Sequence, residues 1–313
     1  MSILVYLFGI LLAFGTAICW AMSPVFIRQA MDKGAGMNEV NPARSFGFLG
    51  AASLCLIITN GFDWPQIGLM PMIVLIFSVI MSSVVGDQLY IYSIRKIGAS
   101  IAVSVSSVYL LVSAVTAIIV LKESVTIPVA SGTALIIAGI LVITHISKDK
   151  DKGNKPKRGS LSAADMLSGA VLSLGAAFCW GISMPLVKLM MDMGDQLSPT
   201  ELYFWRSVVY LALIWGVRFV EMWKFPGVVT PMRNISPAAW LALLASGAFG
   251  LAFGGVLFAA CANILPMTVA APISAASPLF TILMARFMCG EHLTKAQNAG
   301  VALVMTGSVV ISL

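Results

Sequence analysis

Charged residues are scarce in this sequence. They make up 10% of its 313 residues, whereas 59% are apolar, and the mean hydropathy is +0.96. Soluble domains carry about 25% charged residues, so too few charges are present here to cover a surface that faces water. The scarcity excludes the class of soluble enzymes and indicates a polytopic membrane protein without a sizeable domain outside the membrane.

The sequence also lacks cysteine pairs and a basic leader. Its five cysteines fall inside or at the end of apolar segments, and none belongs to a Cys-x-x-Cys motif. Neither a disulfide framework nor a zinc site is therefore indicated, and we expect no cofactor. The N-terminus runs into a long apolar stretch without the charged region of a signal peptide, so we expect a retained first span.

Catalytic and nucleotide-binding motifs are missing as well. There is no His-Glu-x-x-His, Gly-x-Ser-x-Gly or Gly-x-x-x-x-Gly-Lys motif. Only one acidic residue, Asp87, lies deep inside an apolar run, so the carboxylate pair that intramembrane proteolysis needs is absent. Rings of charge and carbonyl-rich filter loops, which are typical of ion channels, are absent too. We therefore expect neither an enzyme, an ATP-driven pump nor a channel.

Long apolar runs are what the sequence has in abundance. A membrane-spanning helix needs about 20 predominantly apolar residues, and the polar punctuation predicts ten such helices in an all-α membrane protein. The first five are Leu4–Ile27, Ala43–Thr59, Met70–Ile94, Ser100–Leu121 and Ile127–Thr144. The second five are Met166–Met190, Pro199–Val220, Pro237–Ile264, Thr268–Met288 and Ala296–Ile311. The basic segment Ser147–Ser160 separates the two sets, which predicts repeats at residues 1–146 and 165–313 joined by a linker at 147–164.

The two halves repeat one another. Identical residues recur at a spacing that changes from 160 through 162 to 168 along the chain. The pairs are Gly15/Gly175, Ala17/Ala177, Cys19/Cys179, Trp20/Trp180, Ser23/Ser183, Arg44/Arg206, Gly86/Gly254, Ala102/Ala270, Ser106/Ser274, Glu123/Glu291, Thr126/Thr294, Gly132/Gly300 and Gly139/Gly307. Because five spans is an odd number, the second half enters the membrane from the opposite side. Ten helices in two inverted five-helix repeats is an architecture of many secondary transporters.

Several of these repeated residues also resemble a known family. Each half has the same three marks in the same order. They are a Gly-x-x-x-x-Trp run (GTAICWA and GAAFCWG), an arginine (in ARSF and WRSV), and a Glu followed three residues later by a Thr (in VLKESVT and MCGEHLT). With these marks the chain resembles the ten-span EamA-type members of the drug/metabolite transporter superfamily over nearly its whole length. The resemblance implies a transporter, and it names no substrate, because the family carries solutes of many kinds.

Asp87 is the leading candidate for a functional residue. An ionisable group inside a span is costly in hydrocarbon, so we expect it to face the bundle interior or a wet cavity. It is either a coupling carboxylate or an anchor for a cationic group, or else a carboxylate bonded to a neighbouring helix. Tyr90 follows it by three residues and shares its helical face, and Gln88 lies nearby.

Further candidates for the cavity wall are polar or aromatic residues within other spans: Trp20, Trp180, Tyr109, Asn263, Ser106 and Ser274. Arg44 and Arg206 stand at the starts of equivalent spans, where extension of the side chain to the lipid headgroups is the expected arrangement. Tyr203 is expected in the interfacial aromatic belt. Glu123 and Glu291 are expected to cap or pack loops, and the spaced glycines are expected to let helices approach closely.

We therefore predict secondary-active transport of a small polar metabolite, such as an amino acid-like solute, by alternating access. The expected partners are the solute, membrane lipids and a coupling ion (H⁺ or Na⁺), with no nucleic acid, and the protein is a monomer or homodimer. Two alternatives stay open, a flippase for a lipid carrier or hydrophobic solute and a non-transporting membrane scaffold.

The basic residues also predict an orientation in the membrane. Of the 19 Lys and Arg, 16 fall on the side that holds loops 1–2, 3–4, 5–6, 7–8 and 9–10, and three fall on the side that holds both termini. Short basic loops stay in the cytoplasm. This distribution places the 147–160 linker in the cytoplasm and both termini outside the plasma (inner) membrane, although many relatives are thought to keep their termini inside.

Overall fold

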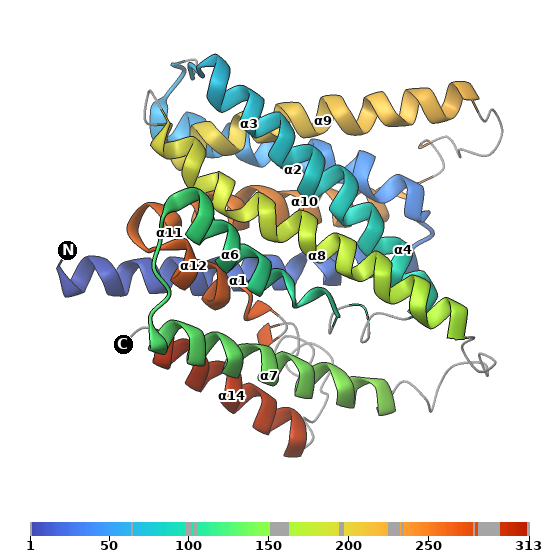
Figure 1. Ribbon diagram of the computed structural model, residues 1–313. Coiled ribbons are helices and arrows are strands. Elements are labelled where there is room, and N and C mark those ends of the chain that lie inside the picture. The colour runs from blue at the N-terminus through green and yellow to red at the C-terminus, as the bar shows by residue number, and fades with distance from the viewer. Residues whose placement is uncertain are drawn as a thin grey trace.

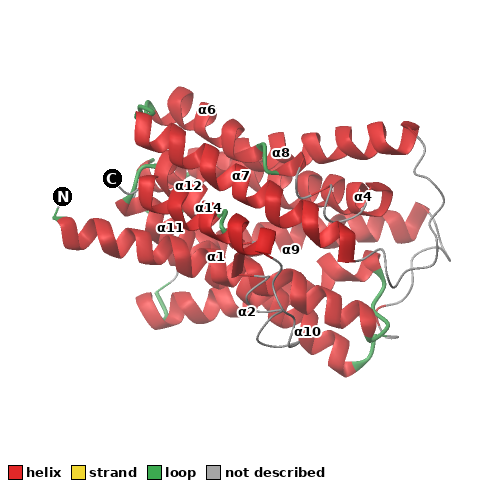
Figure 2. Ribbon diagram, turned by 90° about the horizontal axis from the view of Figure 1, so that it is seen from below, coloured by secondary structure: helices red, strands yellow, loops and turns green. Residues whose placement is uncertain are grey.

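The computed structural model describes residues 2–63, 65–97, 102, 105–150, 163–193, 197–224, 232, 235–277, 279–280 and 295–311. Every regular element within these ranges is a helix, and none of them is a strand (Figure 2). The predicted all-α class is therefore confirmed for the described part of the chain. Predictions that concern Glu291, Thr294 or most of the basic linker lie outside the described residues.

Long helices that run back and forth make up both halves of the chain (Figure 1). The elements of the first half are α1 (Ile3–Asp32), α2 (Met37–Asn60), α3 (Leu69–Val79), η1 (Ile80–Gly86), α4 (Asp87–Ile97), α6 (Tyr109–Leu121) and α7 (Ile127–Lys150). Those of the second half are α8 (Ala163–Asp192), α9 (Pro199–Lys224), α10 (Pro237–Gly247), η4 (Ala248–Phe253), α11 (Gly254–Ile264), α12 (Met267–Ser274) and α14 (Lys295–Ile311).

Residues that are typical of helix ends begin and end these helices where the sequence predicts breaks. The hydroxyl of Ser236 accepts the amide N–H of Ala239 at 3.2 Å, and Pro237 occupies the first turn of α10. Both are common at helix starts, since a serine oxygen caps a free N–H and proline needs none. Gly61 follows α2 with a φ of 65°, a backbone conformation that glycine adopts without strain.

Six helical segments of the described chain are long and apolar enough to cross a membrane. They are Ile3–Asp32, Asn38–Asn60, Leu69–Ser93, Ala164–Asp192, Pro199–Lys224 and Pro237–Ile264. Three further helices are apolar but shorter: Tyr109–Leu121, Ile127–Val142 and Asn298–Ile311. Of the predicted span Thr268–Met288, the structure describes α12 and a few residues beyond it. The described part thus supports a multi-pass membrane protein, and ten complete spans stay a prediction.

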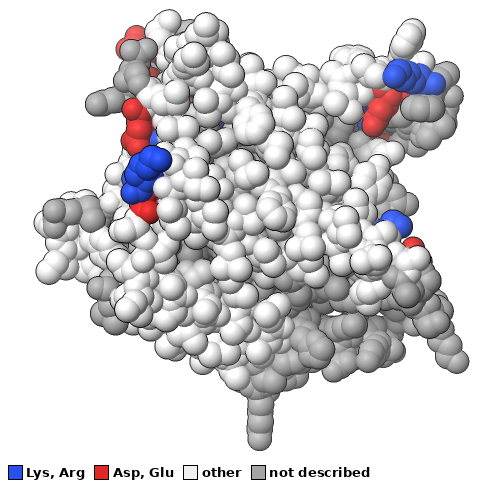
Figure 3. Space-filling model, in the orientation of Figure 1, with Lys and Arg blue, Asp and Glu red and all other residues white. Residues whose placement is uncertain are grey.

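The outer surface of the bundle is apolar. Leu11, Ile58, Ile119 and Leu241 come from different helices, and each side chain is more than 60% exposed. Figure 3 shows the described charges gathered at two opposite edges, with an uncharged band between them. Water-soluble proteins do not expose apolar surface of this extent. The band therefore fits the hydrocarbon core of a bilayer.

The third long helix of each half contains a π-helical segment at the same place. In the first half η1 joins α3 to α4, and in the second half η4 joins α10 to α11. A tryptophan from the other half packs on each segment: a Cβ added to Gly86 would lie 3.0 Å from Trp180 Nε1, and one added to Gly254 would lie 2.9 Å from Trp20 Nε1. Single π turns are rare and occur frequently at functional sites.

Glycines join the last helices of the two halves. A Cβ on Gly132 would lie 2.6 Å from the carbonyl oxygen of Gly307, and one on Gly139 would lie 2.7 Å from that of Gly300. Helices α7 and α14 therefore meet backbone to backbone, side by side in Figure 1. The prediction that these glycines allow close helix packing is confirmed. Small residues are the common way for membrane helices to approach one another.

Enlarging one of these glycines is expected to destabilise the bundle. Gly132→Leu would push a side chain into the backbone of α14, and overpacking of this kind costs about 1–3 kcal/mol. The matched control is Gly50→Leu, because Gly50 is also within a helix but has nothing within 4 Å of its added Cβ. Thermal unfolding in detergent should show a lower midpoint for the first variant alone. Equal midpoints would contradict the close contact between α7 and α14.

Candidate functional site

Arg206 on α9 is held by serine hydroxyls inside the bundle. Its Nη1 donates to Ser78 Oγ at 2.8 Å and its Nη2 to Ser82 Oγ at 3.4 Å. The hydroxyls of Ser78 and Ser183 share a hydrogen bond of 2.7 Å. The Arg206 side chain is only 7% exposed, so the expectation that it extends to the headgroups is wrong.

Arg44 on α2 has the corresponding surroundings in the other half. Its Nη1 donates to Asn41 Oδ1 and its Nη2 to Ser23 Oγ, both at 3.3 Å, and the hydroxyls of Ser23 and Ser246 are 2.9 Å apart. This arginine is also 7% exposed, and the headgroup expectation is wrong for it too. Both arginines lie seven residues inside their helices, about 10 Å along the axis, which is too deep for that role.

The two arginine clusters occupy equivalent positions in the repeat. Ser23 and Ser183 are 160 residues apart and the arginines are 162 apart, whereas Ser78 and Ser246 are 168 apart. These are the same spacings, in the same order, as for the other repeated pairs. Ser78 and Ser246 are not among the residues predicted from the sequence, although their spacing of 168 identifies them as a repeated pair. The duplication thus includes two equivalent buried networks, each with an arginine and a serine from one half and a serine from the other.

Asp87 is held by a tryptophan from the other half of the chain. The indole Nε1 of Trp180 on α8 donates to Asp87 Oδ1 at 3.1 Å and also to the carbonyl oxygen of Ser82 at 3.2 Å. Ser82 belongs to η1, and its carbonyl oxygen also accepts the backbone N–H of Asp87 at the end of the π turn, so two donors share this oxygen. Asp87 as a whole residue is partly exposed, so it is not sealed within the packed core.

Two tyrosines complete an aromatic wall around Trp180. The ring of Tyr90 on α4 lies 4.9 Å from the Trp180 ring at 61°, and the ring of Tyr109 on α6 lies 6.2 Å away at 90°. Edge-to-face contacts of this kind are the favoured geometry for aromatic pairs. Asp87, Tyr90, Tyr109 and Trp180, all candidates from the sequence, therefore come together from three helices.

Gln88 and Asn263 do not join this cluster. The side chain of Gln88 is exposed, because neighbouring residues on a helix point in different directions and Gln88 cannot share the face of Asp87. Asn263 lies near the end of α11 and is exposed as well. The expectation that these two residues line a cavity with Asp87 has no support from their positions.

The remaining candidates lie in the packed interior. Trp20 packs on Phe258, with ring centroids 5.4 Å apart. Ser106 is 5% exposed in the short helical segment before α6, and Ser274 is fully buried at the end of α12. The Ser274 hydroxyl has no hydrogen-bond partner among the described residues.

The two halves differ at the position of Asp87. Its counterpart is Gly255, and the ring of Tyr203 fills the space where a Gly255 side chain would be. Tyr203 is 7% exposed and lies under the Arg206 guanidinium, 5.4 Å from ring centroid to Cζ. The expectation that Tyr203 belongs to an interfacial aromatic belt is therefore wrong. The carboxylate of Asp87 has no counterpart in the second half, because an aromatic ring occupies the equivalent place.

Glu123 ties the two halves together near one edge of the bundle. Its Oε1 accepts the amide N–H of Met267 at 2.7 Å, and its Oε2 accepts that of Thr268 at 2.9 Å. A carboxylate at a helix N-terminus satisfies free N–H groups and interacts favourably with the helix dipole. The prediction that Glu123 has a capping role is confirmed, and its target is α12 of the other half.

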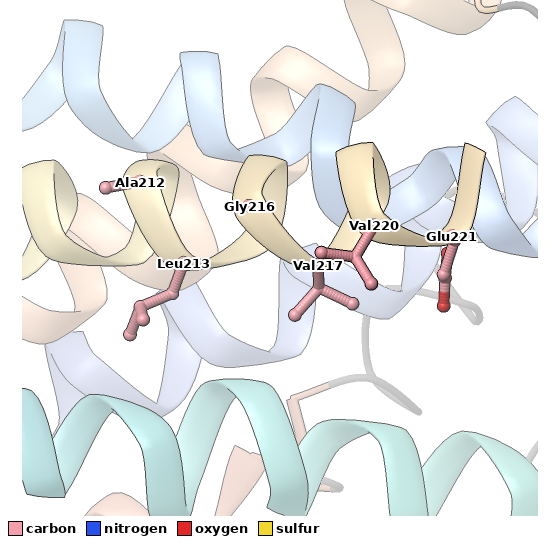
Figure 4. Close-up of a pocket in the computed structure, with 6 residues that line it drawn as sticks. All are labelled: Ala212, Leu213, Gly216, Val217, Val220 and Glu221. Atoms are coloured by element: carbon pink, nitrogen blue, oxygen red, sulfur yellow. The ribbon is translucent and has the colours of Figure 1, made fainter. Parts of the chain in front are cut away.

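Other chemistry has little support within the described residues. They hold no group of three or more His, Cys, Asp or Glu side chains that could bind a metal ion. A groove along α9 is lined by Ala212, Leu213, Gly216, Val217, Val220 and Glu221 (Figure 4). Apart from one exposed glutamate this groove is apolar, so it suits a hydrocarbon chain better than a polar solute. The cluster around Asp87 and Trp180 is the candidate site for a polar solute.

Taken with the apolar exterior, these contacts define a multi-pass membrane protein with a polar, aromatic site inside a helical bundle. The model of the EamA-like transporter family matches residues 7–145 and again residues 167–313. The chain therefore belongs to the EamA-like transporter family, and the resemblance in its sequence motifs is confirmed.

Comparison with solved structures supports the fold. One chain, described as "Crystal structure of protein", has a TM-score of 0.73 and 17% sequence identity, with 97% of this chain and 98% of that chain covered. At this identity the likeness concerns the fold alone. No curated protein matches the chain.

Removal of the indole donor should weaken the cluster. Trp180→Phe keeps an aromatic ring but removes the hydrogen bonds to Asp87 and to the Ser82 carbonyl, and we expect a loss of about 1–3 kcal/mol in the free energy of unfolding. Trp20→Phe is the matched control. Trp20 is the counterpart of Trp180, and Gly255 stands where Asp87 has its counterpart, so the Trp20 indole has no equivalent carboxylate. Thermal unfolding in detergent compares the two. A larger loss for Trp20→Phe would contradict the importance of the Trp180–Asp87 hydrogen bond.

Proposed function

We propose that this protein is a secondary-active transporter for a small polar organic solute that carries an ammonium group. It works by alternating access between two inverted five-helix repeats, residues 1–146 and 165–313, joined by the 147–164 linker. The two segments matched by the family model support this division. Equivalent contacts at the two arginine clusters, the two π segments and the α7–α14 interface support the repeat.

The observation that carries the proposal is the position of Asp87. A carboxylate in the middle of a span is expensive in hydrocarbon and usually marks a pathway for a substrate or ion. It is partly accessible and has Trp180, Tyr90 and Tyr109 around it. An anionic group next to aromatic faces attracts organic cations through charge and cation–π interactions. H⁺ or Na⁺ is the proposed coupling ion, with Asp87 as the coupling residue.

A difference in helix packing supports two alternating states. Helices α2 and α10 meet at Gly47 and Gly247, where an added Cβ on either residue would overlap the other helix's backbone. The counterparts of these glycines in the repeat are Val209 and Val79, which cannot allow the same approach. One interface between the halves is thus tighter than its equivalent. In an alternating-access cycle, the bulkier interface is the one that separates more readily.

One observation favours a second candidate function. The groove on α9 is apolar (Figure 4), and most of the residues that line it are exposed. Such a groove suits movement of a lipid-linked or other hydrophobic solute along the bundle surface. A flippase of this kind would not need the charge of Asp87. The variant that neutralises this charge therefore separates the two candidates.

We propose a plasma-membrane location with both termini outside. Figure 1 has both termini at one edge of the bundle, and the end of α7 and the start of α8 at the other. Arg44, Arg206 and Arg218 are buried, so they do not act as loop charges. When Arg44 and Arg218 are left out, 14 Lys and Arg remain on the linker side. When Arg206 is left out, 2 remain on the side of the termini. The excess on the linker side persists, and it favours that side as cytoplasmic.

Neutralising Asp87 is expected to abolish the response to cationic solutes. Asp87→Asn keeps an oxygen that accepts the Trp180 N–H but carries neither charge nor a transferable proton. We expect about 10-fold or greater loss of affinity for ammonium compounds and loss of uptake driven by a pH gradient. Thermal shifts against a panel of primary amines and amino acids, followed by uptake into proteoliposomes, measure these effects.

Glu221→Gln is the control for this experiment. It removes one exposed carboxylate at the end of the α9 groove, and we expect unchanged binding and uptake of the same compounds. Full activity and an unaltered pH dependence in Asp87→Asn would remove Asp87 from the mechanism and favour the flippase.

The orientation is tested with single cysteines in a background without the five native ones. A cysteine at Ser160 should resist a membrane-impermeant maleimide in intact cells, whereas one at Ser2 should react. Permeabilisation should expose the first position. Strong labelling of Ser160→Cys in intact cells, with none at Ser2→Cys, would mean that the protein has the opposite orientation.

A further inference from the structure

The two arginine–serine networks lie nearer opposite sides of the membrane. Helix α2 begins on the linker side, where α7 ends and α8 starts, whereas α9 begins on the termini side, where both ends of the chain lie (Figure 1). Arg44 lies seven residues inside α2 and Arg206 lies seven residues inside α9. Arg44 therefore belongs to a linker-side network, and Arg206 belongs to a termini-side network.

Both networks cross the boundary between the two halves of the chain. On the linker side, Arg44 donates to Ser23 of its own half at 3.3 Å, and the hydroxyl of Ser23 lies 2.9 Å from that of Ser246 in the other half. On the termini side, Arg206 donates directly to Ser78 of the other half at 2.8 Å. Each network therefore joins one half to the other, and both are formed in this structure.

Burial makes these networks suited to switching between two discrete states. Their residues are each at most 7% exposed: Ser23, Arg44, Ser78, Ser183, Arg206 and Ser246. Hydrogen bonds are stronger in the protein interior than in water, and a buried donor without a partner is costly. If the halves separate on one side, however, water enters and replaces the lost partners. A partly separated network has neither the protein partner nor water, so intermediate arrangements are unfavourable.

Ser82 connects the termini-side network with the candidate site. Its hydroxyl accepts a hydrogen bond from Arg206 Nη2 at 3.4 Å, and its carbonyl oxygen accepts the indole N–H of Trp180 at 3.2 Å. The same indole N–H donates to Asp87. A displacement of Ser82 would therefore alter both the network around Arg206 and the hydrogen bonding of the site.

The linker-side network lacks this connection and has tighter packing. The counterpart of Ser82 in the repeat is Gly250, and a Cβ added to Gly250 would lie 2.5 Å from Ser23 Oγ. The network thus occupies the place that a side chain would need. A Cβ added to Gly247 would overlap the backbone of Arg44, so α2 and α10 are in backbone contact beside the network. The linker side is held by this contact as well as by hydrogen bonds, whereas the corresponding positions on the termini side are valines.

We propose that the two networks are the gates of the alternating-access cycle, one on each side of the membrane, and that Ser82 couples the termini-side gate to the candidate site. This inference rests on the proposed function and assigns residues to its conformational change. The gate at Arg206 opens more readily, because no backbone contact between glycines reinforces it. Binding at Asp87 changes the hydrogen bonding of Trp180 and acts through Ser82 on this gate alone.

Two matched pairs of spin labels report on the two sides. Met70 near the start of α3 and Asp192 at the end of α8 belong to different halves and are exposed on the termini side. Their counterparts in the repeat, Ala238 and Asp32, are exposed on the linker side. Cysteines at these positions, in a background without the five native ones, carry the labels. Pulsed electron spin resonance in proteoliposomes measures the fraction of molecules with the longer, open distance in each pair.

Ser78→Ala and Ser246→Ala are the decisive variants, because each removes one hydroxyl that joins the halves. We expect Ser78→Ala to raise the open fraction of the termini-side pair about 5-fold or more without opening the linker-side pair. Ser246→Ala should open the linker-side pair alone, and by less, since the contact between Gly47 and Gly247 remains. The control is Ser308→Ala, a change at a buried serine whose described hydrogen bond stays within α14. It should alter neither pair.

The coupling through Ser82 is tested with a double-mutant cycle on the termini-side pair. Ser82→Ala removes the hydroxyl that Arg206 contacts and keeps the carbonyl that Trp180 contacts. We expect Asp87→Asn alone to change the open fraction about 2-fold or more, and the same change to have little effect in the Ser82→Ala background. Effects that simply add would show that Ser82 does not couple the site to the gate.

The outcomes separate this inference from the proposed function. If Ser78→Ala or Ser246→Ala opens the opposite side, or leaves both distances unchanged whatever its melting temperature, the networks are static contacts while the transporter still stands. If the unsubstituted protein keeps a single distance in both pairs, with and without a pH gradient and with each amine of the panel, alternating access fails together with the gates.

Discussion

The hydrogen bond from Trp180 to Asp87 is the contact on which the proposed site depends. It joins the two halves of the chain at the one acidic residue that lies deep within a span, and the same indole N–H also reaches the Ser82 carbonyl. Two local features support it: Gly86 gives the indole room, and the Tyr90 ring packs against the indole. The Ser82 carbonyl also accepts the backbone N–H of Asp87 at the end of the π turn. A charge in hydrocarbon needs such partners to be tolerated.

Duplication explains the framework, and departures from it explain the site. Equivalent residues build two arginine–serine networks and two π segments, so both halves can pack in the same manner. At the position of Asp87, however, the second half has glycine covered by Tyr203. A perfectly symmetric bundle would carry two charged sites, whereas this one fills the second with an aromatic ring. The chemistry of the protein is therefore concentrated where the repeat is broken.

Much of the fold and part of the site could be predicted from the sequence. Long apolar runs and repeated residues predict the helices, and the glycine spacing of seven predicts the contact between α7 and α14, because close backbone approach needs small residues. Predictions for the arginines and Tyr203 were wrong, since sequence position near a helix start does not reveal how deep a side chain lies. Gln88 shows a second limit of sequence reasoning. It follows Asp87 directly in the chain, yet it does not lie on the same helical face.

The sequence by itself determined the membrane environment, the duplication and the one costly carboxylate. These follow from composition, spacing and the price of charge in hydrocarbon, which need no knowledge of three-dimensional contacts. Only the tertiary structure decided which groups surround that carboxylate. Trp180 reaches it from the other half, and the rings of Tyr90 and Tyr109 pack against that indole. Contacts between residues far apart in the chain depend on how helices cross, and periodicity within each helix carries no record of that.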